Sequence, residues 1–430
     1  MKIVYLVTSS GGSFYCTNCY RDMLFFKAIK KYENAEVEAL PLYLPPEKIY
    51  VENGFSTDVF FGAVSLFIRE KIPALEKMPT FLEKIFDSPP LLNIAAKSAS
   101  STRTSGLEEM TLSLIDSSSR KHIKELENLV KYLRESAKPD IIHLSNSLII
   151  GLAKQIKDYL DVKIVCSLQN EDDWINEMKE PYQSKAWKMI GKESVNVDAF
   201  ISPSKYFRDF IVSKTGISSD KIKIVPTGIE PETAVIPAAK KAVEPAIGFL
   251  SRVSYNNGFD KLVDAFIKIK DSGDFENLNL HVCGGYTADD KPFIKEQIKK
   301  INDSGFKNSV RIFQEFQGKG KTEFLESVCL ISVPVRKPDA YGLYVLEANA
   351  AGVPVVEPST GSFPEIIEAT DGGILYEPDT VDALTENILN LLRNSDILKE
   401  TGLRGRKNVL TKLTTVQTAN ALMQVYSNLL

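Results

Sequence analysis

The segment Asp339-Ala-Tyr-Gly-Leu-Tyr-Val-Leu-Glu347 places two carboxylates on either side of a glycine-marked junction between a loop and a helix. Leu343 to Ala351 is apolar enough to form a buried helix, so Glu347 needs strong hydrogen-bond donors, because an unpaired buried carboxylate is costly. The vicinal hydroxyls of a sugar would supply them. The N–H groups around Gly342 and Leu343 open that helix and can receive a phosphate, which the helix dipole also favours. A nucleoside diphosphate fits both features. The alternative is a plain buried helix whose glutamate caps or pairs locally.

Short apolar, β-branched runs recur along the chain and are separated by helix-like segments. A chain of 430 residues is too long for one core of usual size, so we expect two domains. The runs indicate buried parallel strands, and therefore two doubly wound, Rossmann-like α/β domains with ligands bound in the cleft between them. The first series is Lys2–Val7, Val37–Leu44, Asp140–Leu144, Lys163–Leu168, Asp198–Ser202 and Lys221–Val225. The second is Ala246–Leu250, Leu278–Cys283, Val310–Phe313, Leu330–Val335, Pro354–Glu357 and Ile374–Tyr376.

The boundaries between these domains follow from composition. The N-terminal domain is predicted to span residues 1–235, with a weakly patterned insertion at about 45–119. Residues 236–245 are rich in proline and small residues, which suits an interdomain linker. The C-terminal domain is predicted to span residues 246–408, and residues 409–430 have helical character.

Charge and hydropathy exclude several classes of protein. Charged residues make up 25% of the chain, the formal net charge is −4 and no long basic run is present, which argues against a nucleic-acid groove. No apolar run is long enough to span a bilayer, and Ile3–Val7 is too short for a signal sequence, so we expect a cytoplasmic protein. Phe60–Ile68 could touch lipid or a hydrophobic acceptor, but a local core beneath a lid is the favoured interpretation.

Two further motifs of the second domain end strands with glycine-containing loops. Ile247-Gly-Phe-Leu-Ser-Arg252-Val-Ser-Tyr-Asn-Asn257-Gly258 reads as a strand, a loop and the start of a helix. His281-Val-Cys-Gly284-Gly285-Tyr286 ends another strand, and its glycines allow close backbone approach by a ligand. A simple tight turn is the alternative for the second motif.

Together these motifs resemble those of retaining GT-B glycosyltransferases of the family 4 type. The segment at Asp339 resembles the family's two glutamates separated by seven residues, with aspartate in the first position. The loop at Arg252 resembles a signature in which an arginine and a lysine five positions later hold the donor diphosphate, with Asn257 in the lysine position. The resemblance implies that Glu347 holds the nucleotide ribose and that Asp339 faces the transferred sugar. Arg252 would neutralise the leaving diphosphate.

The resemblance also implies a full set of site residues. The donor would be a UDP- or GDP-linked sugar, with no metal or other cofactor. The donor-binding residues would be Arg252, Asn257, Gly284, Gly285, Tyr341, Gly342, Leu343 and Glu347. Asp339, Arg252 and His143 would be catalytic, and the C-terminal helix would cross back to the first domain.

In the first domain, three strand ends carry polar or glycine-rich motifs. Asp140-Ile-Ile-His143-Leu-Ser145 resembles the family's H-x-H strand end, and a strand-end histidine with satisfied hydrogen bonds is the alternative to catalysis. Gln169-Asn-Glu171-Asp172-Asp173 could hold Mg²⁺, but the resemblance favours Gln169 and Asp172 as acceptor contacts. Gly11 and Gly12 would lie near the donor phosphate or the acceptor.

After these glycines comes Cys16-Thr-Asn-Cys19-Tyr-Arg-Asp22 at the start of a helix. The run resembles that of a divergent bacterial subgroup of family 4-like proteins. A helix start can lower thiol pKa values, so redox or zinc chemistry is conceivable, with packing or shaping of the acceptor site as the default.

The resemblance therefore predicts a retaining hexosyl- or related glycosyltransferase. Its acceptor would be a glycan, a lipid-linked molecule or a small molecule. The alternative is a catalytically weak or inactive GT-B protein that binds a nucleotide sugar or a glycan. The departures from the family pattern at Asp339 and Asn257 motivate this alternative. An epimerase or phosphorylase on the same scaffold is disfavoured, because no lysine context for a cofactor is evident.

Overall fold

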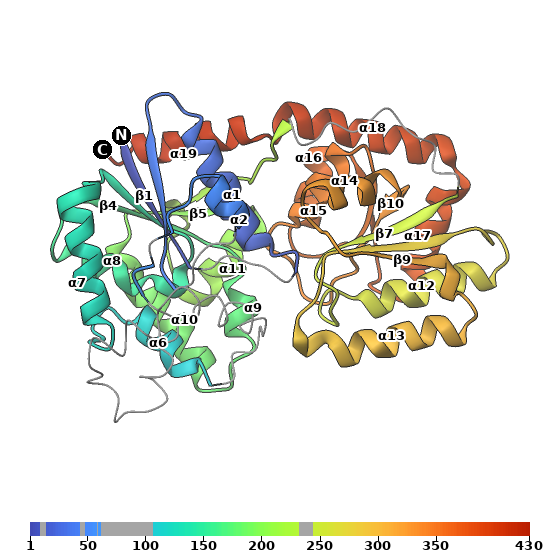
Figure 1. Ribbon diagram of the computed structural model, residues 1–430, viewed down its shortest axis with the longest axis horizontal. Coiled ribbons are helices and arrows are strands. Elements are labelled where there is room, and N and C mark those ends of the chain that lie inside the picture. The colour runs from blue at the N-terminus through green and yellow to red at the C-terminus, as the bar shows by residue number, and fades with distance from the viewer. Residues whose placement is uncertain (9–13, 44–47, 58, 62–105, 232–243) are drawn as a thin grey trace. The chain divides into compact units, whose positions relative to one another are not determined.

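The computed structural model describes residues 1–8, 14–43, 48–57, 59–61, 106–231 and 244–430. The chain forms two compact units (Figure 1). Unit 1 contains Met1–Gly12, Asn18–Pro226 and Thr418–Leu430, and unit 2 contains Ser13–Thr17 and Thr227–Gln417. Most of the predicted linker and most of the predicted insertion lie outside the described residues.

Unit 1 is built on a six-stranded parallel sheet with the order β2-β1-β3-β4-β5-β6. Its central strand β1 is almost fully buried, with Ile3, Tyr5 and Leu6 each at most 1% exposed, as expected when helices cover both faces of a sheet. The strands are β1 (Lys2–Val7), β2 (Glu36–Pro41), β3 (Ile141–Leu144), β4 (Lys163–Ser167), β5 (Ala199–Ser202) and β6 (Ile222–Ile224). The helices are α1 (Thr17–Lys30), α2 (Lys48–Glu52), α6 (Glu108–Ile115), α7 (Ile123–Tyr132), α8 (Gly151–Lys157), α9 (Glu171–Ile175), α10 (Tyr182–Glu193) and α11 (Lys205–Thr215).

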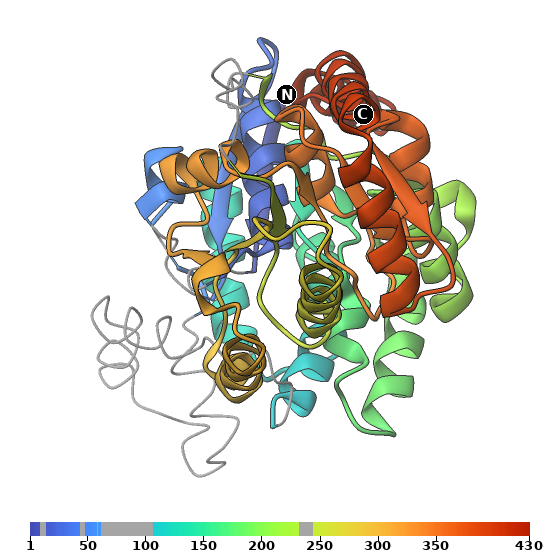
Figure 2. The same ribbon diagram turned by 90° about the vertical axis from the view of Figure 1, so that its right-hand side faces the viewer.

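Unit 2 contains a second six-stranded parallel sheet, with the order β12-β11-β10-β7-β8-β9. Helices α12 and α13 lie side by side on one side of this sheet, and α14, α15 and α16 lie on the other (Figures 1 and 2). The strands are β7 (Ala246–Leu250), β8 (Asn279–Cys283), β9 (Val310–Phe313), β10 (Leu330–Ile331), β11 (Val355–Pro358) and β12 (Gly373–Tyr376). The helices are α12 (Phe259–Asp271), α13 (Lys291–Asp303), α14 (Gly318–Glu326), α15 (Leu343–Ala350), α16 (Phe363–Thr370), α17 (Val381–Arg393) and α18 (Ser395–Lys412).

The strand order of unit 2 identifies where a ligand is expected. The chain runs outward from β7 to β9, and then returns to the other side of β7 to form β10. The order reverses between β7 and β10, and open α/β sheets bind ligands at such a switch point, beyond the carboxyl ends of the strands. The loops that follow β7 and β10 are the ones that carry Arg252 and Asp339.

The predicted strands are present in both sheets, within a few residues of their expected bounds. The largest difference is at Leu330–Val335, where β10 ends at Ile331. Beyond β10, the Val333 N–H donates to the Glu357 carboxylate at 3.3 Å rather than to a neighbouring strand, and Pro334 has no N–H to continue the ladder. The expected two-domain α/β architecture is therefore confirmed.

The last helix, α19 (Thr415–Ser427), lies mostly in unit 1, to which Thr418–Leu430 belongs. Thr418 Oγ1 donates a hydrogen bond to the carbonyl of Pro226 at 3.0 Å. Of the apolar run 60–68, only Phe60 and Phe61 lie within the described residues. Phe61 is fully buried, as a local core requires. Within the described ranges, no helix is long and apolar enough to cross a bilayer.

Candidate active site

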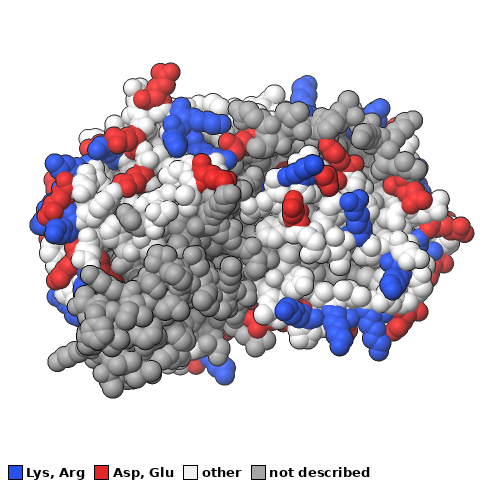
Figure 3. All heavy atoms as spheres, viewed as in Figure 1, with Lys and Arg blue, Asp and Glu red and all other residues white. Residues whose placement is uncertain are grey.

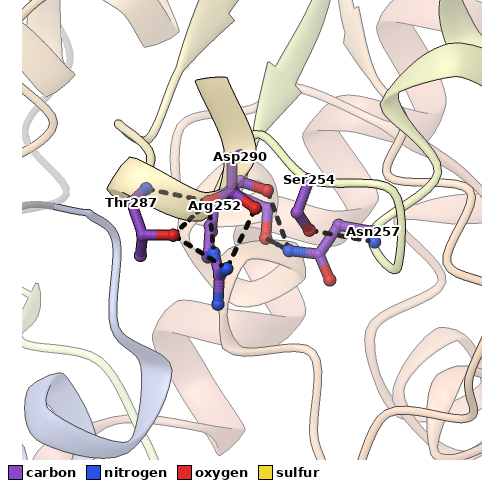
Figure 4. A network of polar contacts seen from close by, with 6 residues as sticks. Arg252, Ser254, Asn257, Thr287 and Asp290 are labelled. Carbon is purple, nitrogen blue, oxygen red and sulfur yellow. Dashed lines mark hydrogen bonds and ion pairs between the residues drawn. The ribbon is translucent and has the colours of Figure 1, made fainter. Parts of the chain in front are cut away.

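Arg252 follows β7 and is held by a carboxylate from the loop after β8. Its Nε and Nη2 donate to the two oxygens of Asp290 at 2.8 and 2.9 Å, and Nη2 also donates to Thr287 Oγ1 at 3.1 Å (Figure 4). Thr287 and Asp290 form a capping box at the turn before α13, which fixes the carboxylate. Neither residue was predicted as part of the site, although the Thr-x-x-Asp spacing indicates such a cap.

Asn257 closes the same loop on itself. Its side-chain Nδ2 donates to Ser251 Oγ at 3.0 Å and to the carbonyl of Arg252 at 2.9 Å (Figure 4). Its backbone N–H donates to Ser254 Oγ at 3.3 Å. In this structure the amide therefore shapes the loop that presents Arg252, and its predicted contact with a diphosphate stays a prediction.

Glycines allow the loops at the switch point to touch. Gly258 has a φ of +71°, and a Cβ there would lie 1.9 Å from the carbonyl oxygen of Pro334, in the loop after β10. Gly284 has a φ of +149°, and a Cβ there would lie 2.0 Å from the carbonyl oxygen of Ser251. The backbone that lies close to Gly284 is therefore that of Ser251. The predicted approach of a ligand to this glycine stays a prediction.

Asp339 caps its own loop. Its Oδ1 accepts hydrogen bonds from the N–H groups of Tyr341 at 2.7 Å and Gly342 at 2.6 Å. Burial raises the pKa of the Asp339 carboxyl, and these two hydrogen bonds partly oppose that effect. The Gly342 N–H therefore has an acceptor within its own loop, and its predicted contact with a phosphate stays a prediction.

Gly342 and Tyr341 position the start of α15. Gly342 has a φ of +45°, and a Cβ there would lie 2.7 Å from the ring of Phe363. The hydroxyl of Tyr341 donates to the carbonyl of Thr227 at 2.9 Å. Leu343, the first residue of α15, is fully buried. A left-handed residue at this cap is compatible with glycine and little else.

Glu347 has the strong donors that its burial demands. The side chain lies on α15 and is 7% exposed. Oε1 accepts a hydrogen bond from Nζ of Lys321 on α14, and Oε2 accepts one from the hydroxyl of Tyr15. Both partners are distant in the sequence, and no local pattern indicated either of them.

Tyr15 belongs to a short described segment, residues 14–17, that is part of unit 2 and contacts the turn after β8. Its N–H donates to the carbonyl of Gly284 at 2.6 Å, and Phe14 forms an antiparallel bridge with Gly285. The ring centroid of Phe14 lies 5.3 Å from the Arg252 guanidinium. Two consecutive residues therefore contact the groups predicted to hold the diphosphate and the ribose. Gly11 and Gly12 lie outside the described residues.

His143 is a structural residue of unit 1. It has no exposed surface, its Nδ1 lies 2.7 Å from the hydroxyl of Tyr426, and its Nε2 lies 2.8 Å from Ser167 Oγ. Burial, with a smaller contribution from the Arg21 charge, lowers the pKa of His143 to about 3. A neutral imidazole with both nitrogens paired cannot reach a substrate without local unfolding, so the structure argues against the catalytic role predicted for His143.

Gln169 is also internal to unit 1. It is 4% exposed, and its Nε2 donates to Asp22 Oδ1 at 3.2 Å. The hydroxyl of Tyr5 donates to the same oxygen at 2.5 Å, and burial raises the pKa of Asp22 to about 7. The predicted acceptor contact of Gln169 therefore lacks an exposed side chain.

Two of the three acids that follow Gln169, Glu171 and Asp172, are buried as well, and Asp173 is exposed. Asp172 is 9% exposed. Glu171 accepts hydrogen bonds from the N–H groups of Ser147 and Gln169 and from Ser147 Oγ, at 2.8–3.0 Å. Across the described parts of the chain, no three histidine, cysteine or acidic side chains gather in a way that could hold a metal ion.

The Cys-x2-Cys run covers the residue before α1 and the first turn of that helix. Cys19 is buried on α1, Cys16 is partly buried just before it, and none of the five cysteines forms a disulfide. Arg21, two residues beyond Cys19, donates to the carbonyl of Leu168 at 2.7 Å. The run thus joins the segment that contacts Glu347 to the buried polar cluster of unit 1.

Two families cover most of the described chain. Residues 110–233 match the family described as Glycosyltransferase Family 4, and residues 235–408 match Glycosyl transferases group 1. The chain is a family 4-type glycosyltransferase.

Sucrose-phosphate synthase from Thermosynechococcus elongatus is similar in fold to this glycosyltransferase, with a TM-score of 0.71 at 15% identity over 100% of this chain and 98% of that chain. The Anabaena protein HepE, solved in complex with UDP, has a TM-score of 0.70 at 14% identity over 100% of both chains. The fold is GT-B.

A curated relative gives the same assignment at the level of sequence. The D-inositol 3-phosphate glycosyltransferase of Xylanimonas cellulosilytica is 24% identical over 207 residues, which is 44% of this chain and 48% of the relative. The chain spans about half the length of the curated relatives it matches.

Proposed function

We propose that this glycosyltransferase moves a sugar from a nucleoside-diphosphate donor to an acceptor with retention of anomeric configuration. One observation carries the proposal. The dipeptide Phe14–Tyr15 contacts Arg252, Gly284 and Glu347 together. These groups are therefore close enough for one small ligand to contact all of them. They lie beside the switch point of the sheet, where such ligands bind.

The charges of this region suit a diphosphate and a ribose. Arg252 and Lys321 are cations, and Arg252 would neutralise the charge that develops on the leaving phosphate. Glu347 would accept hydrogen bonds from the ribose hydroxyls. With no nucleophile evident, we propose front-face substitution, in which the leaving phosphate takes the proton of the acceptor hydroxyl. The UDP complex of HepE makes UDP-sugars the first donors to test.

A second candidate is a protein of this fold that binds nucleotide sugars without turnover. Three groups that the resemblance assigns to the donor already have partners within the chain. Arg252 is paired with Asp290, the Asn257 amide is used inside its loop, and Asp339 caps its own loop. Each contact would have to be shared or broken for catalysis, and this observation favours weak activity.

The two candidates are separated by combining turnover and binding measurements on Asp339→Asn. The amide keeps an acceptor oxygen for the Tyr341 and Gly342 N–H groups, so the loop is preserved while the charge is lost. We expect slow hydrolysis of a UDP- or GDP-sugar by the parent, and about 100-fold slower turnover in the variant with little change in Kd. The anomer released first, followed by proton NMR, tests retention.

A surface acid of unit 2 gives the matched control. Asp382 has a side chain that is 84% exposed and pairs only at the surface with Lys268. Asp382→Asn should keep the turnover of the parent. Nucleotide binding without turnover of any donor would favour the binding protein, and absence of binding to UDP, GDP and their sugars would reject both candidates.

A further inference from the structure

We infer that the Tyr15 hydroxyl occupies the position on Glu347 that the proposed function assigns to a ribose hydroxyl, so that a nucleotide must displace it. The inference rests on the proposed function, because it concerns the regulation of that site. It makes residues 14–17 a segment of the chain that competes with the donor.

The hydrogen bond between Tyr15 and Glu347 is buried, and backbone contacts hold Tyr15 in place. Tyr15 is 6% exposed and Glu347 is 7% exposed, so the bond between hydroxyl and carboxylate is shielded from water. The backbone fixes the side chain, because the Tyr15 N–H donates to the carbonyl of Gly284 at 2.6 Å and Phe14 bridges Gly285. A shielded bond to a charged acceptor is stronger than a neutral, exposed one.

Tyr15 and a nucleotide ribose would make the same kind of hydrogen bond to Glu347. A phenol and a ribose hydroxyl each donate an O–H to the carboxylate. Lys321 holds Oε1, so Oε2 is the oxygen at which Tyr15 and an incoming hydroxyl meet. The Phe14 ring covers Arg252 at the same time, with its centroid 5.3 Å from the guanidinium. One short segment thus lies over both groups that the donor would need.

Removing only the hydroxyl tests the competition. Tyr15→Phe keeps the ring and the backbone bond to Gly284, and it leaves Oε2 available to the ligand. We expect UDP to bind roughly tenfold tighter to this variant, the size expected when one hydrogen bond to a charged group no longer competes. Binding of UDP is measured by calorimetry.

A second ligand identifies the competing group. 2′,3′-Dideoxy-UDP carries no ribose hydroxyl and cannot donate a hydrogen bond to Oε2 of Glu347. Its affinity should therefore be equal in the parent and in Tyr15→Phe. The matched control is Tyr132→Phe, which deletes a tyrosine hydroxyl that donates to Glu38 in unit 1. The control should bind UDP as the parent does.

The outcomes are distinct. Unchanged or weaker UDP binding by Tyr15→Phe, in a parent that does bind UDP, would overturn the competition and leave the proposed function intact. An equal gain for UDP and the dideoxy ligand would overturn it as well, because the hydroxyl would then act elsewhere. If neither the parent nor any variant binds a nucleoside diphosphate, the proposed function fails and this inference fails with it.

Discussion

Polar side chains collect near strand ends in both sheets, but the two collections differ in what burial does to their charge. In unit 1, His143 and Asp22 are at most 4% exposed, and each is hydrogen-bonded to other buried side chains. Burial disfavours the charged form of each. In unit 2, the side chains of Arg252 and Lys321 are 19% and 15% exposed and each pairs with a carboxylate. In this chain, the charged side chains that pair beside glycine turns are those of unit 2, and they form the candidate active site. In unit 1, burial instead favours the neutral forms of His143 and Asp22.

The largest expected effect concerns the pH dependence of stability, because His143 and Asp22 act in opposite directions. Folding raises the pKa of Asp22 from 3.8 to about 7, so its contribution to stability is present below pH 3.8 and is lost as the pH rises to about 7. Folding lowers the pKa of His143 from 6.5 to about 3, so its contribution is present above pH 6.5 and is lost as the pH falls. Each is on the order of 4 kcal/mol at about 1.4 kcal/mol per pKa unit.

Single variants separate the two contributions. In Asp22→Asn the free energy of unfolding should rise more steeply with pH between about 4 and 6.5 than in the parent. In His143→Gln it should instead fall between about 4 and 7, because only the Asp22 contribution is left. Urea denaturation across this range measures both slopes. Parallel profiles for the parent and both variants would show that neither group titrates as its burial requires.

A smaller effect is expected for Glu347, the buried carboxylate of the candidate site in unit 2. Glu347→Gln should weaken UDP binding by about 1.5–3 kcal/mol, the range for a lost hydrogen bond to a charged group. His143→Gln should leave UDP binding unchanged, since His143 is internal to unit 1. Calorimetry measures both, with far-ultraviolet circular dichroism as the folding check. Equal losses in the two variants would remove the distinction between a structural and a functional strand end.

The smallest effect is expected for Asn257→Lys, which restores the family's lysine. The added charge should tighten UDP binding, but loss of the bonds from Nδ2 to Ser251 and Arg252 opposes this, so we expect a net gain of less than about 1 kcal/mol. The gain should shrink as salt increases. Asn256→Lys, on a neighbouring exposed residue, is the matched control. A gain of equal size in the control would indicate general attraction rather than a restored contact.

Strand positions and the need of Glu347 for strong donors could be predicted because they depend on local order. Apolar runs at the observed spacing indicate buried parallel strands wherever the chain must cover both faces of a sheet. The burial of Glu347 follows from the apolar residues of its own helix. Gly342 likewise marked the predicted junction between a loop and a helix, and α15 begins at the next residue.

The partners of these groups could not be predicted, because they come from distant parts of the chain. Lys321 and Tyr15 reach Glu347 only once α14 and the segment 14–17 are in place. Asp290 meets Arg252 because β7 and β8 are neighbours. The same reason applies to His143, whose sequence position matched a family motif, while its Nδ1 lies at the hydroxyl of Tyr426, far along the chain.

The sequence by itself thus determined the two doubly wound sheets, the loops at the switch point and the residues that carry charge there. The periodicity of apolar residues and the positions of glycines and charges can be read from neighbouring residues without knowledge of the fold. Only the tertiary structure decided which of those charges are neutralised by the chain and which polar groups are sealed inside unit 1. Burial and hydrogen-bond partners set ionisation, and both depend on contacts between residues that lie far apart in the sequence.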